Sequence, residues 1–236
     1  MKHRILLWTM SLLGLMLTAC NRDYEPLPEH VNHVFPLQEG KHRIYHVVDT
    51  IYETATGPYD ARTYYRKDLT DGTEQDLLDR KVYKLWRYTS PDTLNGGLDY
   101  QWSYLDLWTQ YLDDYYAERI EGNRRRLVLR IPPYVGSTWN GNLYNNLDAQ
   151  TYRYLSIDTT VVIRGTTFEH CVAVLQIPAR KAGIKGSTYY REEHAYEIYA
   201  PYVGLILRHE KFYEEQNGTP VPESMVLHEE LVSHNY

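Results

Sequence analysis

The chain has 236 residues, with 25 Lys and Arg against 31 Asp and Glu, which gives a formal net charge of −6 at pH 7. This negative balance is a poor match for nucleic acid, so we expect no nucleic-acid partner. A chain of this length can bury about 70% of its unfolded surface, so it needs no disulfide or metal to fold.

The first twenty residues have the pattern of a secretory signal. Lys2 and Arg4 give the positive start, residues 5–17 form a short apolar run, and small residues lead to Cys20. The apolar run is too short to span a bilayer comfortably. The stretch Leu-Thr-Ala-Cys at 17–20 resembles the bacterial lipobox, in which the cysteine thiol is acylated and becomes the new N-terminus. We therefore expect a signal peptide over 1–19 and lipidation of Cys20, with palmitate as an acyl chain, as the attachment to the membrane.

Residues 20–34 have the composition of a lipidated tether. Two prolines, several acidic residues and little periodicity separate Cys20 from the rest of the chain. Asn21 follows the cysteine, and the absence of Asp at that position favours the outer membrane in Gram-negative bacteria. We expect a cell-envelope protein, with the periplasmic and the surface-facing orientation both open.

The rest of the chain, residues 35–236, is expected to be a single β-rich domain. Residues 41–52 alternate with a period near two, and Asp71-Gly72 is a hairpin signal. Residues 98–119 have both helical spacing and a high density of aromatics, and we favour strands there. About ten strands and little helix predict an antiparallel sheet that forms a curved open barrel or a sandwich. The expected β runs are 41–52, 61–67, 82–88, 98–119, 125–131, 151–163, 168–177, 188–199, 203–213 and 224–232.

Aromatic residues supply the candidate ligand contacts. The chain has 24 Tyr and 5 Trp beside only 3 Phe. On a strand, Tyr100, Trp102 and Tyr104 lie at alternate positions and share one face, and Trp108 follows them. Such a row can bind a glycan or a peptide. The alternative is that the row belongs to the core.

The sequence contains no catalytic signature. Nucleophile-elbow, Walker, dinucleotide and zinc-protease motifs are all missing, and no histidines have the spacing of a rigid metal site. Cys171 lies in the apolar run Cys-Val-Ala-Val, where a buried thiol is inert. We therefore expect no catalytic residue, no metal and no cofactor.

Four stretches resemble a group of secreted Bacteroidota lipoproteins. They are Phe-Pro-Leu-Gln-Glu-Gly at 35–40, Ile-Pro-Pro-Tyr-Val-Gly-Ser-Thr-Trp at 131–139, Gly-Thr-Thr-Phe-Glu-His-Cys-Val at 165–172 and Tyr-Ala-Pro-Tyr-Val-Gly-Leu-Ile at 199–206. In the last stretch, Tyr202 stands where such turns usually have glycine. The resemblance implies a β-rich fold with a curved antiparallel sheet in some members. Most members have no assigned activity, so no functional residue is carried over.

A second resemblance concerns glycosylation. Bacteroidota attach O-glycans at Asp-Ser/Thr followed by an apolar residue or Thr, and this pattern occurs at Thr50, Thr93 and Thr159. Thr93 is the preferred site because it lies in an expected exposed turn.

These features predict a non-enzymatic, lipid-anchored envelope protein that binds a glycan, a peptide or another envelope protein. The first alternative is a periplasmic carrier or chaperone that shelters lipid or lipoprotein acyl chains, which needs a concave apolar face free of filling side chains. The second alternative is a hydrolase whose site assembles only in the fold.

Overall fold

The computed structural model describes residues 33–52, 60–91 and 99–236, and these residues form a 13-stranded antiparallel sheet. The predicted fold class is therefore confirmed. No helix in these ranges is long and apolar enough to cross a membrane. The strands are β1 (Lys41–Ile51), β2 (Asp60–Gln75), β3 (Lys81–Pro91), β4 (Ser103–Leu112), β5 (Tyr116–Glu121), β6 (Arg124–Arg130), β7 (Thr138–Asn140), β8 (Thr151–Ile163), β9 (Thr166–Gly183), β10 (Tyr189–Ala200), β11 (Gly204–Gln216), β12 (Thr219–Pro220) and β13 (Met225–His234).

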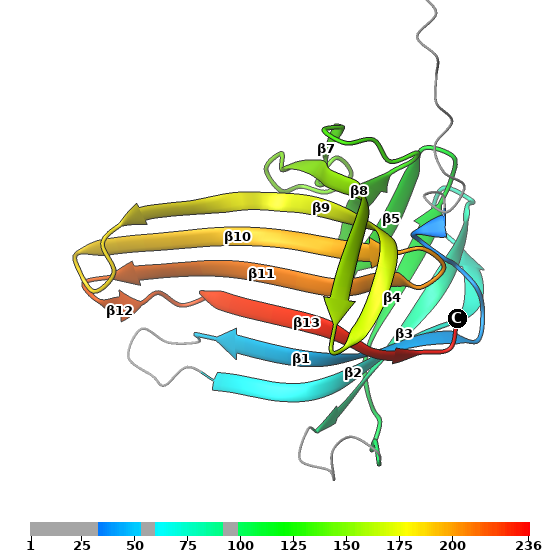
Figure 1. Ribbon diagram of the computed structural model, residues 1–236, viewed down its shortest axis with the longest axis horizontal. Coiled ribbons are helices and arrows are strands. Elements are labelled where there is room, and N and C mark those ends of the chain that lie inside the picture. Colours follow the sequence, from blue (N-terminus) through cyan, green and yellow to red (C-terminus); the bar gives the residue numbers. More distant parts are fainter. Residues whose placement is uncertain (1–32, 53–59, 92–98) are drawn as a thin grey trace, which may run out of the picture.

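The sheet curls into a nearly closed barrel (Figure 1). Its strands follow the order β6-β5-β4-β3-β2-β1-β13-β11-β10-β9-β8-β7, and β12 pairs only with β11. Most neighbours are also consecutive in the chain, as expected for a fold built from hairpins. The first and last strands of the path, β6 and β7, meet at one seam.

Several hydrogen bonds bridge this seam. The backbone N–H of Leu127 donates to the carbonyl of Gly141 at 3.0 Å, and Trp139 Nε1 donates to the Leu127 carbonyl at 2.9 Å. The hydroxyl of Tyr154 donates to the Arg130 carbonyl at 2.6 Å. Buried aromatic side chains therefore satisfy backbone groups that a regular strand pair would otherwise satisfy.

Six long strands, β9, β10, β11, β13, β1 and β2, run side by side over much of the molecule, and the β8–β9 hairpin bends across them (Figure 1). The tip of this hairpin reaches β13, where Arg164 Nη1 lies 3.8 Å from Glu230 Oε2.

The hydrophobic core is concentrated in the second half of the chain and around the seam. Val34 and Phe35 are buried within it, so the packed body includes the residues directly before β1. The largest core side chains are Tyr45, Leu127, Leu129, Trp139, Tyr152, Tyr154, Tyr199 and Ile206.

Two local predictions can be compared with the strands. Residues 98–119 contain β4 and β5, so the preference for strands over helix is confirmed. The hairpin predicted at Asp71-Gly72 is wrong, because β2 continues to Gln75 and the register against β3 shifts between Thr70 and Thr73. Gly72 has φ +81°, so this Asp-Gly pair forms a bulge inside the strand.

The turn between β10 and β11 has an unusual residue for its geometry. Tyr202 has φ +63°, a left-handed backbone that favours glycine. Its ring stacks on His33 with centroids 4.7 Å apart, and its N–H donates to the His33 carbonyl at 2.9 Å. The segment before the barrel therefore packs against this turn.

Candidate functional site

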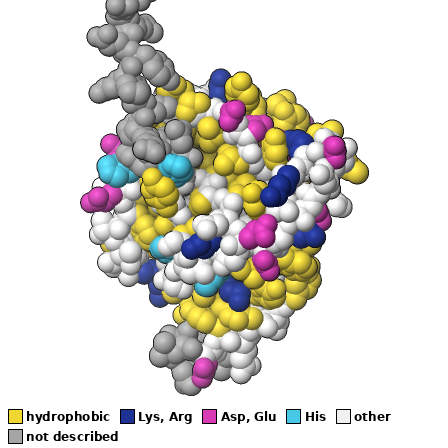
Figure 2. All heavy atoms as spheres, turned by 90° about the vertical axis from the view of Figure 1, so that its right-hand side faces the viewer, with side chains coloured by type: hydrophobic (Ala, Val, Ile, Leu, Met, Phe, Trp, Pro, Cys, Tyr) yellow, Lys and Arg dark blue, Asp and Glu magenta, His cyan; other side chains and the backbone are white. Residues whose placement is uncertain are grey.

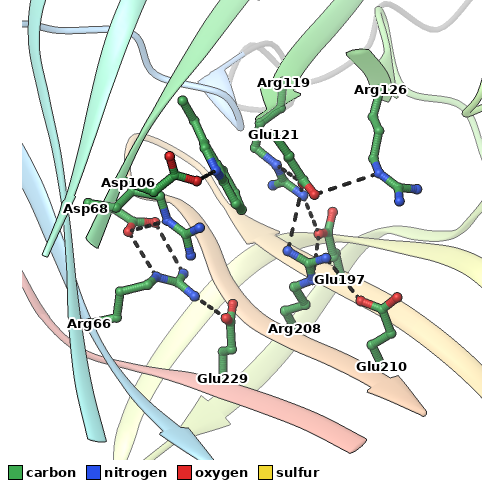
Figure 3. A network of polar contacts seen from close by, with 12 residues as sticks. Arg66, Asp68, Asp106, Arg119, Glu121, Arg126, Glu197, Arg208, Glu210 and Glu229 are labelled. Carbon is green, nitrogen blue, oxygen red and sulfur yellow. Dashed lines mark hydrogen bonds and ion pairs between the residues drawn. The ribbon is translucent and has the colours of Figure 1, made fainter. Parts of the chain in front are cut away.

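Charged side chains fill the inside of the barrel. Arg66 and Asp68 are two residues apart on β2, so both point to the same face of the sheet, and both are buried. Arg119 and Glu121 have the same spacing on β5. Figure 3 shows how these side chains converge with partners from other strands.

The first half of this interior network is centred on Arg66. Its guanidinium donates to both carboxylate oxygens of Asp68, at 2.9 and 3.2 Å, and also to Glu229 on β13. Arg87 from β3 donates to the same Asp68 at 3.3 Å. One carboxylate therefore balances two guanidinium groups, and Glu229 supplies the second negative charge.

The second half of the network crosses the interior. Arg119 on β5 donates to Glu197 on β10 at 2.8 Å and to Glu121 at 2.6 Å, although β5 and β10 are not neighbours in the sheet. Arg208 on β11 lies 3.7 Å from Glu197 and donates to Glu210 at 3.0 Å. These contacts connect opposite walls of the barrel.

Trp108 lies between the two halves. The Arg87 guanidinium is 3.4 Å from its ring centroid and that of Arg119 is 5.7 Å away, while its Nε1 donates to Asp106 at 2.7 Å. This predicted ligand contact therefore faces the interior, where its ring packs against two arginines.

The arginines keep the buried carboxylates ionised. Burial disfavours the charged form of Asp68, but the charges of Arg66, Arg87 and Arg43 together outweigh burial and hold the pKa of Asp68 below its usual value. The same balance, with Arg119 as the strongest cation, lowers the pKa of Glu197 and brings that of Glu121 to about 2. These groups are acceptors at neutral pH and are not suited to act as general acids.

The network encloses little free space. The cavity at its centre measures about 10 Å³, close to the space that one water molecule occupies. Ligand pockets for small molecules usually measure about 300–1,000 Å³. Larger hollows lie on the surface, including a groove of about 950 Å³ beside Pro178 and Arg180 of β9.

The outer face of β2, β3 and β4 is aromatic. On these strands, side chains that alternate with the inward charges point away from the barrel, as Lys67 does between Arg66 and Asp68. We call five rings of this face the outer aromatic surface: Trp86, Tyr88, Tyr100, Trp102 and Tyr104.

Three of the four predicted contact residues belong to this surface. Tyr100 and Trp102 precede β4 and stack with centroids 4.7 Å apart. Tyr104, 60% exposed, packs edge-on against Trp86 at 6.2 Å and Tyr88 at 6.4 Å.

Lys67 connects the two groups of rings. Its Nζ lies 5.2 Å from the ring centroids of both Tyr88 and Trp102. The surface therefore combines flat apolar faces with one positive charge. Figure 2 shows the molecule from the right-hand side of Figure 1. On the face seen there, hydrophobic side chains are interspersed with side chains of both charges.

The remaining predicted sites have different outcomes. Cys20 and Thr93 lie outside the described residues, as do the signal peptide and nearly all of the tether. Thr50 in β1 and Thr159 in β8 are half-buried strand residues, and their glycosylation stays a prediction. Cys171 is fully buried, as predicted, and burial raises the pKa of its thiol to about 11, so its inertness stays a prediction that this burial supports.

No group of three or more His, Cys, Asp or Glu within 33–52, 60–91 and 99–236 is arranged to hold a metal ion.

Sequence reasoning missed the interior network. Its signal was present as residues of opposite charge two positions apart, in Arg66 with Asp68, Arg119 with Glu121 and Arg208 with Glu210. This spacing places both charges on one face of a strand.

The network predicts how stability depends on pH. The pKa of Glu121 is about 2 in the folded protein, against an ordinary value of 4.5. Its contribution, about 3 kcal/mol, is therefore complete above pH 5 and is lost as the pH falls from about 4.5 toward 2. Urea unfolding between pH 7 and 2.5 should show this loss, and Glu121→Gln should flatten it. A free energy of unfolding that is constant from pH 5 to 3 contradicts the prediction.

Comparison with known proteins gives a likeness in structure only. One solved structure, from Bacteroides fragilis, is named as a candidate exported protein with a YmcC-like fold, and a second, from Parabacteroides distasonis, as a candidate lipoprotein. Each is 12% identical to this chain with a TM-score of 0.47, covering 86% of it and 98% or 99% of the other chain. No family model and no curated protein matches the chain. A likeness at this level carries no argument about function, which therefore rests on the site itself.

Proposed function

We propose that this chain is a non-enzymatic, lipid-anchored protein of the bacterial cell envelope that binds a glycan through its outer aromatic surface. The observation that supports this proposal is the grouping of Trp86, Tyr88, Tyr100, Trp102 and Tyr104 on one outer face. The C–H groups of a sugar ring carry a weak positive charge, and the faces of aromatic rings are negative, so the two stack favourably.

The position of this surface favours a glycan over a peptide. Peptides commonly bind by adding a strand to an open sheet edge. Trp86, Tyr88 and Tyr104 lie on β3 and β4, each of which already pairs with a neighbour on both sides, and Tyr100 and Trp102 directly precede β4. On the paired strands recognition relies on side chains, and flat rings suit sugars.

The filled interior weighs against the two alternatives. A carrier of acyl chains needs an apolar space, whereas the cavity within the network measures about 10 Å³ and is lined by several arginines. A hydrolase needs an acid or base that can exchange protons near neutral pH. The pKa of Asp68, Glu121 and Glu197 is instead lowered by paired arginines.

The envelope location rests on sequence patterns. The lipobox-like stretch at 17–20 supports an anchor at Cys20, and the four family-like stretches support a place among secreted Bacteroidota lipoproteins. Asn21 after the cysteine favours the outer membrane.

A glycan array probed with the purified protein tests the binding proposal. Trp102→Ala should weaken binding at least about tenfold, about 1.4 kcal/mol, with only a small decrease in melting temperature, because the half-buried ring precedes β4 and is not part of the hydrophobic core. Tyr115→Ala is the matched control, since Tyr115 is an exposed aromatic residue elsewhere. Unchanged affinity of the Trp102→Ala variant, or a wild type that binds no glycan on the array, contradicts the proposal.

Fractionation of cells tests the anchor. Cys20→Ser should move the protein from the membrane to the soluble fraction and abolish incorporation of labelled palmitate, because the thiol is the acylated group. Cys171→Ala, the matched control at the other cysteine, should leave both results unchanged. Continued membrane partitioning of Cys20→Ser with full labelling excludes this attachment.

A further inference from the structure

One buried arginine inside the barrel has no carboxylate partner. Arg43 on β1 is 4% exposed, and its guanidinium donates to the Val203 carbonyl at 3.3 Å and lies 5.4 Å from the Tyr236 ring centroid. Among the residues that the structure describes, no Asp or Glu forms an ion pair with it. Arginine is rarely buried without a negative partner, so this charge needs an explanation.

The central cavity brings further positive groups to the same place. The guanidinium-bearing side chains of four arginines line it, with a single carboxylate among the lining residues: Arg43, Arg66, Arg119, Arg208 and Asp68. Arg66, Arg119 and Arg208 are already paired with carboxylates, so Arg43 is the arginine of this wall that forms no ion pair among the described residues. The charge of Asp68 acts on Arg43 from a distance, but the hydrogen bonds of Asp68 go to Arg66 and Arg87.

Two donors at this wall also lack hydrogen-bond partners. Arg43 Nε and Arg208 Nε are buried and make no hydrogen bond among the described residues. Gln110 Oε1, which is also buried, likewise makes no hydrogen bond among them. All three residues line the cavity. The oxygen and nitrogen of an amide are assigned from their partners, so the Gln110 amide can equally present its NH₂ group.

The backbone leaves room for the Arg43 side chain. Gly204 has φ +89°, and a Cβ at this position would collide with Arg43 Nη1. The turn before β11 is therefore shaped to let the guanidinium approach closely.

We propose that this cavity is a binding site for a single halide ion, with chloride as the natural occupant. A negative ion neutralises Arg43 and accepts charge-assisted hydrogen bonds from Arg43 Nε–H and from Arg208 Nε–H, which lies 3.7 Å from Glu197 and makes no hydrogen bond among the described residues. The volume of about 10 Å³ is close to that of one water molecule, so a halide, which is slightly larger, fits once the arginine side chains of the wall shift slightly, whereas a polyatomic anion such as sulfate is excluded by size.

Unfolding of the full chain in detergent tests the site. Urea titrations in mixtures of sodium bromide and sodium gluconate at constant ionic strength separate specific binding from screening, because gluconate is too large for the cavity. For one bound ion, the unfolding equilibrium constant should fall up to tenfold for each tenfold rise in bromide above the dissociation constant. Equal stability in bromide and gluconate overturns the proposal.

Two variants locate the effect. Arg43→Met should abolish the bromide dependence, whereas the matched control Arg124→Met, at an exposed position in the β5–β6 hairpin, should keep it. Bromide dependence that persists unchanged in Arg43→Met contradicts this location.

Crystals grown in bromide give a result that does not depend on the stability of any variant. An anomalous peak within hydrogen-bond distance of Arg43 and Arg208 supports the proposal. A water molecule at that place, without anomalous signal, overturns it.

Discussion

Ion pairs that cross the inside of the barrel are the constraint on which the rest of this structure depends. Arg119 on β5 reaches Glu197 on β10, which lies far from β5 in the sheet, and Arg66 connects β2 with β13 across the intervening β1, so strands that do not pair directly are held by side chains. Such pairs add little net stability, since desolvation offsets their attraction, but removing one partner leaves a costly unpaired charge. The interior therefore tolerates only arrangements in which each carboxylate meets its arginines, and this specifies one strand register.

The network also determines which face of the sheet can bind other molecules. Its side chains occupy the interior, and the enclosed cavity measures about 10 Å³. On β2 and β3 the inward residues Arg66 and Arg87 alternate with outward residues such as Lys67 and Trp86. Ion pairs in the interior fix the positions of these strands and therefore of the aromatic rings on their outer face. A preorganised surface of this kind loses less entropy when it binds a ligand.

The sequence predicted the strand content well and the interior poorly. Period-two alternation and turn residues placed most strands, because both depend on local geometry. The interior was missed because charged residues are normally exposed, so Arg66, Asp68 and Glu229 do not look like core residues. Their pairing depends on contacts between strands distant in the chain. The four aromatic candidates could not be divided between faces, because the register of β4 against β3 shifts between Arg87 and Tyr88 and interrupts the period-two alternation before Trp108. Tyr100, Trp102 and Tyr104 lie outside, whereas Trp108 packs against Arg87 in the interior.

A double-mutant cycle between Arg119 and Glu197 tests the central claim most directly. The free energy of unfolding is measured for the wild type, Arg119→Met, Glu197→Gln and the double variant. Each single change should cost about 3–5 kcal/mol, because it removes one of the ion-pair partners of a buried charge. The account predicts that the double variant costs at least about 1 kcal/mol less than the sum of the single changes. Single costs that add to within about 0.5 kcal/mol would contradict it.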